Sequence, residues 1–228
     1  MGSNGEPTRV VVVDPQVLVR SGLAALLGAA PGIDLVGEAA TSEQAMDLVA
    51  TARPQVVLMD IRVPRIGGVA TTRQIVADGR DDRPHVMILA DVGLDDHIPD
   101  ALRAGASGLL HKDTPPERLL AAVTTVAAGN IIVAPPTVHK LIDSCTSAAP
   151  HDLSVLTERE QDILRHVAKG LSNIDIATRL AIAEGTVKTH VNRVMAKLNV
   201  SSRAKAVVIA YESGLVTARF TRDQGPSR

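Results

Sequence analysis

Acidic and basic side chains stand where short apolar runs of this sequence end. Asp14 and Asp60 each close such a run, and Lys112 follows a third. Two carboxylates and an ammonium group in one crevice suit a divalent cation or a phosphoryl group, and a carboxylate can itself accept a phosphoryl group covalently. The alternative is that the aspartates only cap the helices that follow them. The choice depends on whether the fold brings the three residues together.

The elements that carry these residues alternate over the first ~130 positions. Strand-like runs occupy residues 9–13, 33–39, 55–60, 85–90 and 107–111. Helical patterns occupy Gln16–Leu27, Ser42–Ala52, Val69–Asp78, Asp95–Ala104 and Pro116–Ala128. Continuous apolar runs are typical of strands covered on both faces, which predicts a doubly wound, five-stranded parallel sheet. The carboxyl ends of such strands share one edge, so we expect Asp14, Asp60, Ala90 and Lys112 to converge there.

Composition narrows the classes of function. The single cysteine, Cys145, excludes an internal disulfide and a cysteine-based zinc site, and only Tyr211 and Phe220 are aromatic. No apolar run approaches the ~20 residues that span a membrane, and the short polar N-terminus predicts no signal peptide, so we expect a cytoplasmic protein. Residues 1–150 hold 12 basic and 17 acidic residues, whereas residues 151–228 hold 12 and 8. The basic half is therefore the candidate for a polyanionic partner.

The first half resembles the flavodoxin-like receiver domain of NarL/FixJ-type bacterial response regulators. The matching motifs are LVRSGLAALL, IDLVGEA, PQVVLMDIRVP and ALRAGASGLLHKD. The resemblance implies that Asp60 is the phosphoacceptor and that the Lys112 ammonium contacts the phosphoryl group. It also implies that Mg²⁺ binds near Asp14 and Asp60, with the Arg62 carbonyl as a further ligand, and that a sensor histidine kinase is a partner.

Two residues depart from the receiver pattern. Pro15 stands where a second acidic residue is usual, and Ala90 stands where serine or threonine is usual. The first change removes a metal carboxylate, although Pro15 suits the opening of the next helix. The second removes the hydroxyl that moves toward a phosphoryl oxygen and so carries the switch. We therefore predict a degenerate receiver that binds Mg²⁺ weakly and depends little on phosphorylation, held active by default or set by an unidentified ligand or protein. The alternative is a conventional receiver, with an acid such as Asp91 restoring the site.

The second half contains only helical patterns. Thr157 and Glu160 form a predicted capping box at the start of one helix. The stretch SNIDIATRL predicts a second, and GTVKTHVNRVMAKLNV a third. In the third, Val187, Val191 and Val194 form a buried stripe that ends at Leu198. Three such helices predict a helix-turn-helix, against the plainer alternative of a small bundle with a solvated face.

The polar face of the third helix supplies candidate DNA contacts. Lys188 suits the acceptors of guanine and Asn192 suits adenine, with Thr189 beside them. Arg193 and Lys197 suit phosphates.

Residues Leu156–Val216 resemble the LuxR-type DNA-binding domain in the motifs LTERE, GLSNIDIATRL, TVKTHVNRVMAKLNV and SSRAKAVVIAYESGLV. The resemblance implies binding to double-stranded DNA as a homodimer through the final helix, Ser202–Ser213. The dimer contacts expected there are Val207, Val208 and Tyr211. Ala183 replaces a common serine cap, and Ile174 replaces a common polar residue.

The predicted organisation is a receiver at 8–130, a linker with a short helix at 131–152, an all-α four-helix helix-turn-helix domain at 153–217, and a polar tail at 218–228. A transcription regulator, not an enzyme, is therefore the preferred function. The competing class is a small α/β phosphatase or hydrolase with Asp60 as nucleophile. Against it, the sequence has no GxSxG elbow and no glycine-rich phosphate loop.

Overall fold

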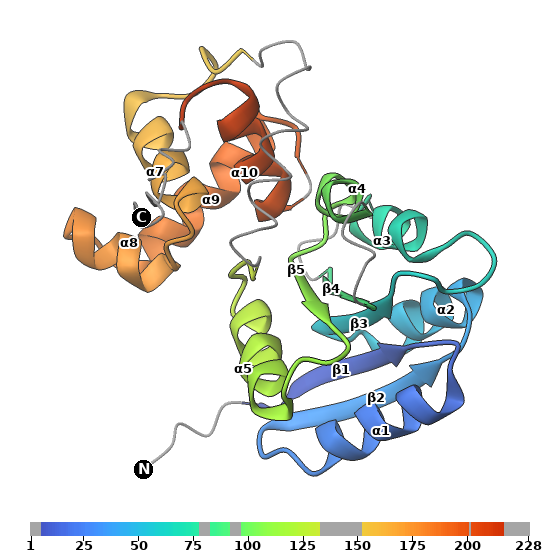
Figure 1. Cartoon of the computed structure of the whole chain (residues 1–228). Helices are drawn as coiled ribbons and strands as arrows, with labels where there is room; N and C mark the ends of the chain where they lie inside the picture. The colour runs from blue at the N-terminus through green and yellow to red at the C-terminus, as the bar shows by residue number, and fades with distance from the viewer. Residues whose placement is uncertain (1–5, 78–82, 92–96, 133–151, 201, 217–228) are drawn as a thin grey trace, which may run out of the picture.

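The chain forms an α/β domain followed by an all-helical domain (Figure 1). The computed structural model describes residues 6–77, 83–91, 97–132, 152–200 and 202–216. Residues 133–151 of the predicted linker, with its short helix, and the tail predicted over 218–228 lie outside the described residues. None of the described helices is long and apolar enough to cross a membrane.

The α/β domain is built on a five-stranded parallel sheet in the order β2-β1-β3-β4-β5. Its strands are β1 (Thr8–Val13), β2 (Ile33–Ala39), β3 (Val56–Asp60), β4 (His85–Ala90) and β5 (Gly108–His111). The valines of β1 alternate between two cores: Val10 and Val12 face one layer of helices, and Val11 and Val13 face the other. This burial on both faces explains the continuous apolar run and confirms the predicted sheet.

Helices cover both faces of the sheet. They are α1 (Val17–Gly28), α2 (Ser42–Ala52), α3 (Gly68–Ala77), α4 (Ile98–Ala104) and α5 (Pro116–Ala127). Helices α1 and α5 contribute to one core, and α2, α3 and α4 to the other. The predicted bounds agree to within one residue, except at the start of α4, where Asp95 lies outside the described residues. Pro15 does not open α1, because Gln16 is the N-cap and the first helical residue is Val17.

The helical domain contains α7 (Glu158–Ala168), α8 (Asn173–Leu180), α9 (Glu184–Lys197) and α10 (Arg203–Glu212). The predicted capping box is present, with the Thr157 amide donating to Glu160 Oε2 at 2.8 Å and the Glu160 amide donating to Thr157 Oγ1 at 3.3 Å. Ser172 and Asp175 form a second box, which was not predicted. Ala183 caps α9 without a side-chain hydrogen bond, as expected. Val187, Val191 and Val194 are buried, as the stripe predicted.

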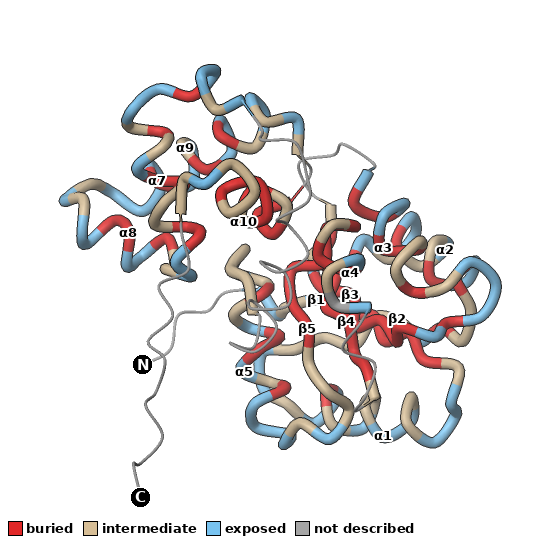
Figure 2. Tube along the Cα trace, turned by 45° about the horizontal axis from the view of Figure 1, so that its top comes forward, coloured by how far each residue is buried: buried red, intermediate tan, exposed pale blue. Residues whose placement is uncertain are grey.

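The two domains meet through α10. Ala204 and Val208 on this helix are buried in the same core cluster as residues of α3 and α4. Figure 2 shows α10 as a largely buried helix between the rest of the helical domain and the sheet. Gly105, in a left-handed conformation at the end of α4, approaches the α10 cap so closely that a Cβ there would lie 3.3 Å from Ser202 Oγ. We call this contact of α10 with α3 and α4 the seam.

Candidate functional site

The three residues singled out first converge as expected at the carboxyl ends of the strands. Lys112 Nζ lies 2.6 Å from Asp14 Oδ2 and in still closer contact with Asp60 Oδ2. Both aspartate side chains are 1% exposed, and the Lys112 side chain is 11% exposed. Burying two carboxylates is costly unless they are paired, and one ammonium group supplies the pairing for both. We call these three residues the crevice.

Each aspartate also holds a backbone turn. Asp14 Oδ1 accepts from the Gln16 amide at 2.8 Å, and Asp60 Oδ1 accepts from the Arg62 amide at 2.5 Å. Each carboxylate therefore uses one oxygen for its turn and the other for Lys112. The helix-capping alternative is wrong for both aspartates, because Gln16 is the N-cap of α1 and α3 begins only at Gly68; each carboxylate instead closes a turn of the backbone.

The residue at the end of β4 adds no polar group to the crevice. Ala90 is 1% exposed, and its carbonyl accepts from the Lys112 amide at 2.9 Å, so the backbone there positions the lysine. The neighbouring Asp91 forms an ion pair with the Arg62 side chain. Asp91 is therefore paired with Arg62 in this arrangement and not with Lys112.

The crevice offers two carboxylates and the Arg62 backbone carbonyl to a divalent cation. Mg²⁺ requires near-octahedral oxygen coordination and gives up its water reluctantly. The described part of the chain contains no group of three acidic, histidine or cysteine side chains that could hold a metal. The only two carboxylates of the crevice already contact an ammonium group. The Arg62 backbone carbonyl is the remaining candidate ligand, and a neutral oxygen does not supply the missing charge.

Sequence reasoning missed one residue beside the crevice. Arg20 on α1 donates to the Asp14 backbone oxygen at 2.7 Å and lies 3.5 Å from Glu38 Oε2 on β2. It ties the end of β1 to its neighbouring strand. A lone arginine in a helical run carries no sequence signal for such a contact.

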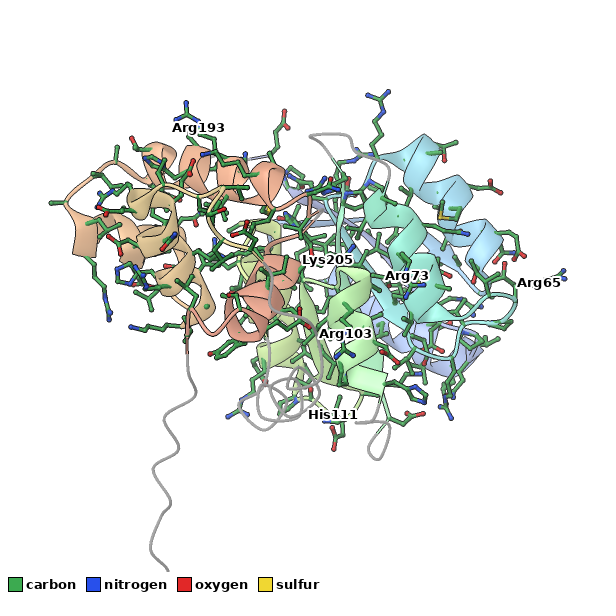
Figure 3. The ribbon with its side chains drawn as sticks, turned by 90° about the horizontal axis from the view of Figure 1, so that it is seen from above. Arg65, Arg73, Arg103, His111, Arg193 and Lys205 are labelled. Atoms are coloured by element: carbon green, nitrogen blue, oxygen red, sulfur yellow. The ribbon has the colours of Figure 1, made fainter. Side chains whose placement is uncertain are left out.

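In the helical domain, α9 presents the predicted polar face. Lys188, Thr189, Asn192 and Arg193 are exposed. The Thr189 hydroxyl donates to the Gly185 carbonyl at 2.9 Å, so it is engaged within its own helix. Figure 3 shows Arg193 pointing away from the protein.

Lys197, the last predicted contact on α9, has a partner inside the domain. Its Nζ donates to Glu160 Oε2 at 2.7 Å. This hydrogen bond, followed by the bond from the Thr157 backbone, holds the pKa of Glu160 below its ordinary value. A phosphate contact by Lys197 would have to compete with this ion pair.

Two of the predicted base-reading residues face the α/β domain. Lys188 and Asn192 line a cavity of about 280 Å³ together with His85 and Ser107, which lie at the amino ends of β4 and β5. A surface that reads the major groove must admit a duplex. In this arrangement, the α/β domain stands where the duplex would approach Lys188 and Asn192.

The three predicted dimer residues lie in different environments. Val208 is 5% exposed and packs into the α/β core cluster. Val207 is half-buried against the cores of its own domain. The Tyr211 hydroxyl donates to the Ala168 carbonyl at 3.1 Å, and burial raises the pKa of this phenol. Within one chain, all three side chains therefore already have packing partners.

Both halves of the chain match models of known protein families. Residues 10–124 match the model described as "Response regulator receiver domain", and residues 154–210 match "Bacterial regulatory proteins, luxR family".

Known proteins resemble the chain over nearly its whole length. It is 34% identical to the uncharacterized transcriptional regulatory protein YxjL of Bacillus subtilis, over 93% of this chain and 99% of that protein. It is 33% identical to the nitrate/nitrite response regulator protein NarL of Escherichia coli, over 92% and 98%. Among solved structures, the response regulator ChrA of a heme-sensing two-component system is similar, with a TM-score of 0.52, 32% identity, and coverage of 93% of this chain and 100% of that chain.

Proposed function

Because the chain belongs to the NarL-type response regulators, which are DNA-binding transcription regulators and not enzymes, we propose that it binds duplex DNA as a homodimer and that phosphorylation is not its main switch. The α/β domain is the receiver domain, and the helical domain is the LuxR-type DNA-binding domain. The observation that carries the second part of this proposal is the crevice, in which one lysine contacts both carboxylates beside a buried alanine.

The proposed DNA contacts are the exposed residues of α9. Lys188 and Asn192 read base edges, with Thr189 beside them, and Arg193 and Lys197 contact phosphates. Lys197 gives up its ion pair with Glu160 to do so. DNA affinity should fall steeply with salt concentration, because cationic side chains release the counterions of the phosphates that they contact.

DNA binding requires the two domains to separate in this proposal. Lys188 and Asn192 face the receiver, and Val208 is buried against it. Separation uncovers both the base-reading face of α9 and the apolar strip of α10. The strip of Val207, Val208 and Tyr211 can then meet its copy in a second chain around a two-fold axis.

Phosphorylation has few groups to act through in this receiver. Asp60 and Lys112 retain the geometry of an acceptor and its ammonium partner, so an acyl phosphate can form there. Ala90 offers a methyl group where a phosphoryl-sensing hydroxyl would stand, and Pro15 provides no metal carboxylate. A modification shifts an equilibrium only by its differential interaction with the two states, and the groups that would supply that difference are missing. A sensor kinase can phosphorylate such a site without switching it, which leaves another ligand or protein as the controlling signal.

The decisive experiment compares wild type with Asp60→Ala for DNA affinity, with and without acetyl phosphate and Mg²⁺. We expect weak Mg²⁺ binding and less than a tenfold change in affinity. The double variant Pro15→Asp/Ala90→Thr restores the usual residue types and is the positive control, which should gain a response. Stoichiometric labelling of Asp60 together with a gain above about tenfold (~1.4 kcal/mol) would instead identify a conventional receiver.

The dimer contact is tested separately by Val208→Asp in the isolated DNA-binding domain, where no receiver covers α10. We expect weaker dimeric binding while circular dichroism shows an intact fold. Loss of the fold together with binding would assign Val208 to the domain core instead.

A further inference from the structure

The cavity at the seam is bordered by cations from both domains. Arg83 comes from the receiver side, beside the imidazole of His85, and Lys188 and Arg203 come from the DNA-binding domain. It lies at the amino ends of β4 and β5, the opposite edge of the sheet from the crevice. No carboxylate among the described residues lines it.

Among the described residues, Arg203 is a buried cation without an acidic partner. It is 8% exposed, and burial lowers the pKa of its guanidinium to about 10. Its two hydrogen-bond acceptors are neutral: Asn173 Oδ1 at 2.6 Å and the Leu171 carbonyl at 2.6 Å. These engage two N–H groups of a guanidinium that carries five. A buried charge is costly unless it is paired, so an anion in the cavity would stabilise this arrangement.

Positive charge extends beyond the cavity walls. Burial lowers the pKa of Lys205 on α10, and the charges of Arg73 on α3 and Arg83 lower it further. Figure 3 shows Lys205 and Arg73 on neighbouring helices of the two domains. Cationic side chains of both domains therefore lie close to one another at the seam.

Neutral groups around the cavity suit an anion as well. Ser202 and the amides of Asn173 and Asn192 line it. Arg203 and Asn173 are the first residues of α10 and α8, so two helix N-termini adjoin the cavity. Each N-terminus favours an anion by typically 0.3–1 kcal/mol, and the C-terminal ends of α3, α4 and α5, which contribute Val76, Gly105 and Ala127 to the lining, each oppose it by a similar amount. The three cationic side chains decide the balance.

We propose that this cavity binds a small phosphate-bearing anion that bridges Arg83 of the receiver to Lys188 and Arg203 of the DNA-binding domain. Its volume of about 280 Å³ is just below the usual range for ligand pockets, which suits a ligand no larger than a sugar or nucleoside monophosphate. A phosphate offers several acceptor oxygens to converging donors, and arginine binds it in a bidentate manner. The bound anion holds the seam closed and engages Lys188, which is thereby withheld from DNA.

Calorimetric titration of the intact chain tests the site without DNA. The probes are inorganic phosphate, ribose 5-phosphate and adenosine 5′-monophosphate, with citrate as a carboxylate control, all at an ionic strength fixed with KCl. We expect saturable binding of at least one phosphate compound with one site per chain. Arg83→Gln should weaken it at least tenfold.

Arg65→Gln is the matched control for loss of one arginine. Arg65 is exposed, lies 3.5 Å from Glu43, and points away from the seam (Figure 3). Tight binding of inorganic phosphate alone would indicate a free-phosphate site, whereas preference for the organic compounds would indicate a metabolite site; either supports the proposal. Absence of saturable phosphate binding, stronger binding of citrate, or equal weakening by both substitutions would overturn it.

A second measurement tests closure and rests on the proposed function. Saturating ligand should weaken DNA binding by wild type at least fivefold and leave the Arg83→Gln chain unchanged. Ligand binding that depends on Arg83 but does not alter DNA affinity would overturn the closing role. If the chain bound no DNA at all, the proposed function would fail, while the titration would still decide the site.

Discussion

At the carboxyl edge of the sheet, Lys112 contacts both Asp14 and Asp60; at the amino edge, Arg83, Lys188 and Arg203 border a cavity without a carboxylate among the described residues. The first site is compensated by its own side chains, whereas the described residues supply no acidic side chain to the second. An ion entering the crevice must displace an existing partner, whereas an anion entering the cavity supplies a missing one. This difference supports both proposals, that the crevice responds weakly to phosphorylation and that the cavity binds an anion.

We expect the largest effect on stability from removing the lysine of the crevice. Lys112→Met leaves two carboxylates, each 1% exposed, without a cation. Loss of one partner of a buried pair typically costs 3–5 kcal/mol, so we expect the receiver to be destabilised by roughly 3 kcal/mol in urea unfolding. Asp14→Asn in the same background should recover part of that loss. A change below about 0.5 kcal/mol would mean that solvent, not Lys112, compensates the carboxylates.

The next largest effects concern the residues that link the cavity to DNA. Lys188→Ala and Asn192→Ala should each cost about 1–3 kcal/mol of binding to a duplex selected from random sequences. The isolated DNA-binding domain is the proper sample, because it removes the competing role of Lys188 at the seam. Arg193→Ala is the control and should weaken binding to all sequences alike. Unchanged sequence preference in both α9 variants would reassign the base-reading residues.

Opening the seam should raise DNA affinity by about tenfold (~1.4 kcal/mol). Ala204 is 3% exposed against the receiver, so Ala204→Glu places a charge in that contact. Electrophoretic mobility shifts of the intact chain should show tighter DNA binding than wild type. The same substitution in the isolated DNA-binding domain should not raise DNA affinity, because no receiver is present to cover α10. An equal effect in both samples would show that Ala204 acts on the helical domain itself.

The two edges also differ in how far the sequence predicts them. A strand end followed by a turn is a local signal, so the sequence alone predicts that Asp14, Asp60 and Lys112 lie together. The capping box and the stripe of α9 are local in the same way. Arg203 could not be identified, because its burial depends on how α10 meets the Leu171 loop and α8, over about thirty residues of chain. The position of Lys188 opposite His85 could not be predicted either, because it depends on how the two domains pack, and such packing leaves no periodic pattern in the sequence.

The smallest expected effect is a dependence of the seam on pH through His85. Burial lowers the pKa of this imidazole, and the charges of Arg83 and Lys188 lower it further. Its Nδ1 lies 3.3 Å from Ser107 Oγ, a neutral partner that does not offset those cations. Because the pKa is lowered in the closed form, that form binds fewer protons than a separated one, and its stability falls as pH drops below the ordinary value of about 6.5.

DNA affinity of the intact chain, measured without added phosphate ligand, should therefore rise a few-fold between about pH 7.5 and pH 5.5, as His85 becomes protonated and the seam opens. His85→Asn keeps a polar group and removes the titration, so it should flatten this part of the profile. The isolated DNA-binding domain provides the baseline for other titrating groups, including His166, whose own pKa is lowered first by burial and then by the Lys169 charge. An identical pH profile in wild type and His85→Asn would show that protonation of this imidazole does not control the contact between the domains.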